Sequence, residues 1–183
     1  MGHVDGDAID WDETDREGMH VRRKELGAAA DGDRLGCSLY ELPAGAKSWP
    51  YHYHTANEEA MYVLEGSGRV RGPDGESAVT AGDYLAFPAS EEGGHHVAND
   101  SGGPLRYLVL STMVEPDVTV YPDSGKFGVY AGAPPGSSDE RTVSGYYRLE
   151  DDVDYWEGET GESRTGPGAP SEDGEDGEDG PDG

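Results

Sequence analysis

Cysteine, lysine and long apolar runs are nearly absent from this chain of 183 residues. Its single cysteine, Cys37, excludes an intrachain disulfide, and we expect it to be a small buried residue. No segment approaches the roughly 20 consecutive apolar residues that a membrane-spanning helix needs. The acidic N-terminus also lacks the apolar core of a signal peptide. We therefore expect a cytoplasmic protein that does not contact a membrane.

Positive charge is also scarce, because 13 Lys and Arg stand against 39 Asp and Glu and give a net charge of −26. Such a surface repels phosphate backbones, which argues against a nucleic-acid partner. Residues 157–183 hold ten acids and one arginine, a charge of −9, so −17 remains on residues 1–156. An acidic tail on an ordinary protein is one explanation. Acidity spread over the whole chain, with only three lysines, resembles proteins of halophilic archaea that keep high salt in the cytoplasm.

Hydrophobic residues make up only 33% of the chain, and part of this deficit lies at the C-terminus. Residues 157–183 contain no aliphatic side chain larger than alanine and end in the repetitive run SEDGEDGEDG, which predicts a disordered acidic tail. Residues 1–30 are expected to form an N-terminal arm and residues 31–115 a β-barrel. Residues 116–156 are expected to pack on the barrel, because YYRLEDDVDYW carries four aromatic residues.

Short apolar runs between turn sequences predict an all-β fold, either a sandwich or a barrel. No window shows a long apolar stripe of helical period, so few helices are expected. Residues 19–26 could form a strand or a helical turn. The other predicted strands are 35–42, 49–54, 59–64, 69–71, 77–80, 83–87, 95–99 and 105–112, with a strand–turn–strand over 118–130.

Three histidines and one glutamate are the candidate functional residues. His52 and His54 stand at i and i+2, so they share one face of a strand. Glu59 begins the next predicted strand, and His95 lies on a later one with His96 pointing away. Three imidazoles and a carboxylate suit divalent first-row metals, here Fe, Mn, Ni or Zn. Open six-coordinate geometry would leave sites for substrate, whereas tetrahedral closure would make the metal structural.

The joint spacing of these residues resembles the two motifs of the cupin superfamily. The first motif is a glycine, H-x-H, a glutamate and a glycine, filled here by Gly45, His52, His54, Glu59 and Gly66. The second is a glycine, a proline and H-x-x-x-N, filled by Gly82, Pro88, His95 and Asn99. Fifteen residues separate the motifs, as in small single-domain cupins. The spacing from Gly66 selects Glu59 over Glu58. The departures are one extra residue before His52, a serine in place of a glycine at Ser90, and two extra residues before His95.

The resemblance implies a double-stranded β-helix, or jelly-roll barrel, with His52, His54, Glu59 and His95 as ligands of a divalent metal ion. Dioxygenases, isomerases and decarboxylases occur among cupins with such ligands, and the sequence does not choose among them. A non-catalytic module that binds or senses a small molecule is the alternative. Tyr51, Tyr53 and His96 are the remaining candidates for acid–base roles. Small cupins often pair, so a homodimer is expected.

Overall fold

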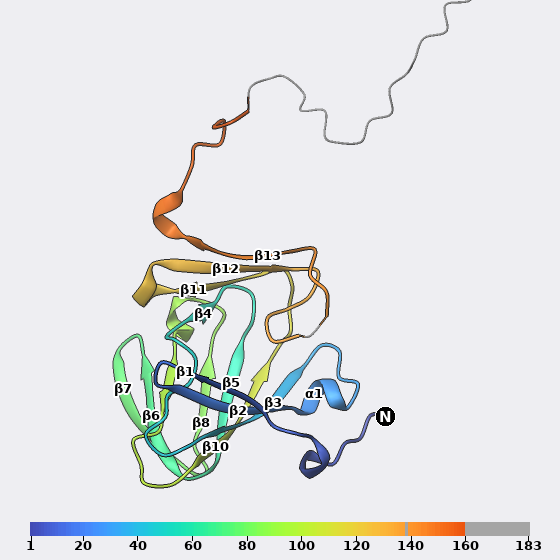
Figure 1. Ribbon diagram of the computed structural model, residues 1–183, viewed down its shortest axis with the longest axis vertical. Coiled ribbons are helices and arrows are strands. Elements are labelled where there is room, and N and C mark those ends of the chain that lie inside the picture. Colours follow the sequence, from blue (N-terminus) through green and yellow to red (C-terminus); the bar gives the residue numbers. More distant parts are fainter. Residues whose placement is uncertain (138, 160–183) are drawn as a thin grey trace, which may run out of the picture. The chain divides into compact units, whose positions relative to one another are not determined.

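The computed structural model describes residues 1–137 and 139–159 (Figure 1). The chain divides into two compact units, Met1–Asp151 and Asp152–Gly183. All strands and helices of the described residues belong to the first unit. Residues 152–159, the described part of the second unit, contain turns but no strand or helix. The predicted disordered tail lies, from residue 160 on, outside the described residues.

Antiparallel β-sheet dominates the first unit, as the sequence predicts. The largest sheet has six strands in the order β1 (Asp12–Arg16), β2 (Met19–Glu25), β3 (Gly36–Leu42), β10 (Leu105–Ser111), β5 (Glu59–Glu65) and β8 (Tyr84–Phe87). A three-stranded sheet has the order β7 (Gly75–Thr80), β6 (Ser67–Gly72) and β9 (His96–Ala98). A four-stranded sheet has the order β13 (Val143–Arg148), β12 (Lys126–Ala131), β11 (Asp117–Tyr121) and β4 (Tyr53–His54).

Helical structure is confined to short segments within the described residues, as expected. The one α-helix is a four-residue turn, and the other helical segments are single 3₁₀ turns: α1 (Leu26–Ala29), η1 (Gly6–Ala8), η2 (Glu91–Gly93), η3 (Pro122–Ser124) and η4 (Leu149–Asp151). Because these segments bury little surface, the sheets carry the fold.

The hydrophobic core draws its side chains from strands of both the six-stranded and the three-stranded sheet. Strand alternation selects them: in β5, Met61 and Val63 are buried whereas Tyr62 and Leu64 are exposed. Tyr107 of β10 is also buried, and its ring stacks on a tyrosine of β3. Each large apolar side chain buried in this way contributes about 1.5–3 kcal/mol. The core therefore joins the six-stranded sheet, which carries Glu59, to the three-stranded sheet.

Two residues of the sequence motifs have structural roles. Gly66 has φ +85°, and a Cβ at this position would lie 2.3 Å from the carbonyl oxygen of Pro104, so only glycine fits. The Asn99 side-chain amide donates to the carbonyl oxygens of Leu42 and Gly103, both at 2.8 Å. Buried Asn99 therefore fixes the turn between β9 and β10.

Candidate metal centre

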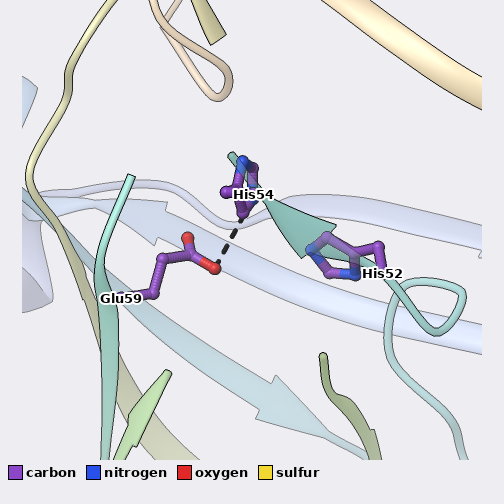
Figure 2. A group of neighbouring side chains, drawn as sticks. All are labelled: His52, His54 and Glu59. Carbon is purple, nitrogen blue, oxygen red and sulfur yellow. Dashed lines mark ion pairs between the residues drawn. The ribbon is translucent and has the colours of Figure 1, made fainter. Parts of the chain in front are cut away.

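Three of the predicted ligands lie close together around the start of β5. His52 precedes β4, His54 ends it, and Glu59 is the first residue of β5. One ligand atom from each residue lies within 4.8 Å of the other two. Figure 2 shows the Glu59 carboxylate directed at His54, with His52 beside them; His54 Nε2 is 3.5 Å from Glu59 Oε2. Alternation across Tyr53 places both imidazoles on the same side of the chain.

His95, which directly precedes β9, lies close to the same carboxylate. Main-chain hydrogen bonds in both directions join it to His52, at 3.2 and 2.9 Å, and the two rings lie 4.8 Å apart. Its Nε2 is 3.6 Å from Glu59 Oε2, while its ring stacks on Phe87 at 3.9 Å. His96 instead bonds through Nδ1 to the carbonyl oxygen of Trp49. The structure therefore brings the three predicted histidine ligands around Glu59, and His52, His54 and Glu59 form the closest group.

Each of the three imidazoles is anchored to an oxygen through Nδ1. The partners are the carbonyl of Pro50 for His52, at 2.8 Å, and the carbonyl of Gly93 for His95, at 2.9 Å. A carbonyl oxygen only accepts, so Nδ1 carries the proton and the lone pair of a neutral ring lies on Nε2. The Nε2 atoms of His54 and His95 face Glu59, which is the arrangement that metal ligation requires.

Asp117 is the anchor of His54, and the sequence analysis did not single it out. Its Oδ2 lies 2.6 Å from His54 Nδ1, and its Oδ1 accepts a hydrogen bond from the main-chain N–H of Ala56 at 2.8 Å. Thr119 Oγ1 lies 3.1 Å from the same imidazole nitrogen. Asp117 and Thr119 are both fully buried. A carboxylate behind a histidine in this way fixes the ring and raises its basicity as a ligand.

Burial and neighbouring charges set the protonation of the imidazoles. Burial lowers the pKa of His95, and burial with the nearby His95 and His54 rings lowers the pKa of His52 well below its usual range. Burial also acts to lower the pKa of His54, but the Asp117 hydrogen bond and the Glu59 charge outweigh it and raise that pKa. His52 and His95 are therefore neutral at pH 7, the state in which an imidazole binds a metal.

A cavity of about 1020 Å³ opens onto His52, His54 and Glu59. This volume is enough for a small organic molecule. Its wall carries five large aromatic residues and three basic residues: Tyr40, Trp49, Tyr121, Tyr130, Tyr146, Arg23, Arg34 and Lys126. Half-buried Cys37 also lines it. The cavity therefore combines candidate metal ligands with aromatic faces, hydroxyl groups and both basic and acidic side chains.

The acid–base candidates from the sequence do not line this cavity, since Tyr51, Tyr53 and His96 are absent from its wall. Tyr40 takes their place. It is buried on β3 directly opposite Arg23 of β2. Burial raises the pKa of Tyr40, while hydrogen bonds from Trp49 and Arg23 oppose the rise. Its hydroxyl is therefore protonated at neutral pH, and Tyr40 lines the cavity as a hydrogen-bonding group.

The fold and the site can now be compared with those of known proteins. Residues 38–111 match the cupin domain family, and the chain aligns with a solved sugar phosphate isomerase from a cupin superfamily, from Silicibacter pomeroyi, with a TM-score of 0.70. The fold is that of a cupin. These two matches support the resemblance to the cupin superfamily that the motif spacing indicates.

The Silicibacter protein is 25% identical to this chain, and the match covers 81% of this chain and 94% of that one. A protein from Acidithiobacillus ferrooxidans, provisionally named a sugar phosphate isomerase, is also 25% identical, with a TM-score of 0.68 over 80% of this chain and 90% of that one. The polyketide cyclase RemF from Streptomyces resistomycificus, 24% identical with a TM-score of 0.53 over 61% and 78% of the two chains, shares the fold alone. No match was found among the curated proteins.

Among the described residues, no helix has the length and the apolar character needed to cross a bilayer.

Proposed function

We propose that this cupin is a metal-dependent isomerase of phosphorylated sugars, with His52, His54, Glu59 and His95 holding one divalent ion. The observation that carries the proposal is the convergence of the predicted ligands on Glu59, with three of them in the wall of a cavity large enough for a sugar phosphate. The isomerase names of the two structural relatives at 25% identity support the reaction class.

The donor set fits a divalent metal. Nitrogen and carboxylate oxygen are ligands common to Fe, Mn, Ni and Zn, and these residues include no thiolate that would select zinc. The anchored Nδ1 atoms leave Nε2 of each ring for coordination. Such a metal would polarise the carbonyl and hydroxyl oxygens of a bound sugar.

The remaining side chains of the cavity supply binding and proton transfer. Interconversion of an aldose and a ketose moves a proton between two adjacent carbons and another between their oxygens, so an acid–base group must reach them. Protonated Tyr40, in the cavity wall, is placed to donate at a sugar oxygen. The flat faces of Trp49 and Tyr121 suit the apolar faces of a sugar, and the tyrosine hydroxyls can bond to its hydroxyl groups.

Metal analysis of the purified full-length protein is the first test. We expect stoichiometric metal in the wild type, a large loss in His54→Ala, and no change in His20→Ala. His20 is a matched control because it pairs with Glu13 on the β1–β2 ladder, away from the cavity. Full retention of metal by His54→Ala would contradict the ligand assignment.

Turnover is tested next by incubating the metal-loaded protein with a panel of aldose phosphates in deuterated water. Ketose formation that disappears after chelation and returns with metal would support the isomerase. Metal binding without any interconversion would count against it. Oxygen consumption would then favour a dioxygenase, and tight ligand binding without turnover would favour the alternative of a binding module.

The cellular setting and assembly are also proposals. We expect a cytoplasmic protein. We also expect a homodimer, because β13 is an edge strand of its sheet in the described chain and exposes Val143 and Tyr147. Light scattering that gives a monomer mass would contradict the dimer.

We further expect the free energy of unfolding to rise from low to molar KCl, since salt screens repulsion among the excess carboxylates. A flat salt response would argue against a halophilic origin.

A further inference from the structure

The wall of the cavity contributed by β11, β12 and β13 holds one lysine and three tyrosines. Lys126 begins β12, and the tyrosine cluster consists of Tyr121, Tyr130 and Tyr146. Lys126 Nζ lies 5.2 Å from the centre of the Tyr121 ring. That ring in turn stacks on His52, with centroids 5.8 Å apart. The Tyr121 ring is therefore an aromatic plate that contacts both the lysine and one of the metal-ligand candidates.

Lys126 forms no ion pair with a carboxylate in the described parts of the chain. Six arginines do form such pairs in this protein of 39 acids and 13 bases. Of the other lysines, Lys24 donates to the carbonyl oxygen of Gly6 and lies over the Trp11 ring. Lys47 is exposed and lies outside the cavity. A half-buried ammonium in the wall of a substrate cavity is thus available to an anionic ligand.

The tyrosine cluster adds hydroxyl donors beside this charge. Tyr130 donates to the hydroxyl of Tyr146 at 2.9 Å, and the rings of Tyr121 and Tyr146 lie 6.0 Å apart. Burial raises the pKa of Tyr121 to about 12 and also raises the pKa of Tyr130. The hydroxyls of Tyr121 and Tyr130 therefore keep their protons at neutral pH. Tyr130 already donates its proton to Tyr146, which leaves the hydroxyls of Tyr121 and Tyr146 to donate to anionic oxygens.

Three carboxylates of the same wall are engaged in polar contacts, and the wall also holds Asp33 and the ligand candidate Glu59. Glu115 accepts from the main-chain N–H of Gly132 at 2.7 Å, and Asp139 accepts from Ser137 at 2.9 Å. Glu25 is paired with Arg23. These contacts hold negative charge in fixed positions, and none of them involves Lys126.

We propose that Lys126 and the tyrosine cluster form the subsite that binds the phosphate group of the substrate. This inference rests on the proposed function, and it assigns the orientation of the sugar phosphate: its phosphate lies at β12 and its carbonyl end reaches past Tyr121 to the metal ligands. Lys126 Nζ lies 5.2 Å from the centre of the Tyr121 ring, and that centre lies 5.8 Å from the centre of the His52 ring. These distances fall within the reach of an extended sugar phosphate.

The test is calorimetric titration of full-length protein at fixed ionic strength with inorganic phosphate, a hexose 6-phosphate and the free hexose. The variants are Lys126→Met, Lys126→Arg and the control Lys47→Met. Loss of one charged hydrogen-bonding partner should weaken phosphate binding by at least about tenfold in Lys126→Met. We expect Lys126→Arg and Lys47→Met to retain binding, and the free hexose to respond equally in all variants.

Titrations are repeated after removal of metal by chelation, which separates this inference from the proposed function. Phosphate binding that persists without metal and is lost in Lys126→Met supports the subsite whatever reaction the cupin catalyses. Equal binding by wild type and Lys126→Met would overturn it. Binding lost on chelation alone would also overturn it, because the phosphate would then sit on the metal. A further variant, Arg34→Met, tests the other base of the wall that forms no ion pair among the described residues. A loss in Arg34→Met in place of Lys126→Met would place the anion there and overturn the assignment to Lys126.

Discussion

Replacing Asp117 by asparagine should reverse the tautomer of His54 while leaving the fold intact. The two carboxylate oxygens of Asp117 face different donors: Oδ1 accepts from Ala56 N–H at 2.8 Å, and Oδ2 lies 2.6 Å from His54 Nδ1. In the variant, the Ala56 N–H requires an oxygen, so the side-chain NH₂ must point to His54. Nδ1 then accepts a hydrogen bond, and the ring proton moves to Nε2, the atom needed for the metal.

The expected loss follows from the role of such partners. Removing the group that orients a metal-bound histidine lowers metal affinity by about 10–100-fold, which is about 1.4–2.7 kcal/mol. Asp117→Asn keeps the shape of the side chain and one of its hydrogen bonds, so its cost in stability is smaller than that of Asp117→Ala. The alanine variant would leave the Ala56 N–H without its partner, at a cost of about 1–3 kcal/mol, and would leave His54 Nδ1 with Thr119 alone.

Competition with a chromophoric chelator measures the affinity, and nitrogen-15 shifts of the imidazole report which ring nitrogen carries the proton. Asp123→Asn is the matched control, because it removes the same charge from an exposed carboxylate paired with Arg71. Unchanged metal affinity in Asp117→Asn, in a protein whose unfolding midpoint is close to that of the wild type, would refute the reasoning.

Three further predictions follow from single contacts. His95→Ala should lower metal affinity whereas His96→Ala should not, and equal affinities by chelator competition would remove His95 from the ligand set. Glu41→Gln should lower the free energy of unfolding in urea by about 1 kcal/mol at pH 7. Burial alone would raise the pKa of Glu41, but hydrogen bonds and charge from Arg106 and Arg22 lower it. The stabilisation by this carboxylate is therefore present above pH 4.5 and is lost as pH falls through the lowered pKa. A mutant difference that persists at pH 2 would contradict this. Gly66→Ala should cost about 2 kcal/mol or more by the same measurement, because of its positive φ and the clash with a carbonyl oxygen, whereas Gly102→Ala, with open space around it, is the neutral control.

Most strands of the barrel could be predicted because their signals are local. Alternating side chains and glycine-containing turns predict strands over 59–64 and 105–112, and the structure has them at Glu59–Glu65 and Leu105–Ser111. The predicted strand at 49–54 is regular only at Tyr53–His54, since Pro50 lacks the N–H that a ladder needs. β1 had no such signal, because the charged run DETDR forms a strand only through its pairing with β2.

The ligand set was accessible from spacing along the chain, whereas the groups that support it were not. His52, His54 and Glu59 lie within eight residues of one another, so strand alternation and one turn bring them together. Asp117 lies 63 residues beyond His54, and no local pattern places it behind that imidazole. Only the pairing of β11 with β4, which sets Thr119 opposite His54, brings the two segments together.

A signal for this second group is nevertheless present in the run DVTVY. Its alternation sets Asp117, Thr119 and Tyr121 on one face of β11 and the two valines on the other. Asp117 and Thr119 contact the Nδ1 edge of His54, and Tyr121 stacks on His52. One face of a five-residue strand therefore fixes the orientation of one candidate ligand and supplies the aromatic plate between a second ligand and Lys126. A register shift of β11 by one residue would remove all three contacts at once, so the candidate metal centre and the wall of the cavity depend on the same strand pairing.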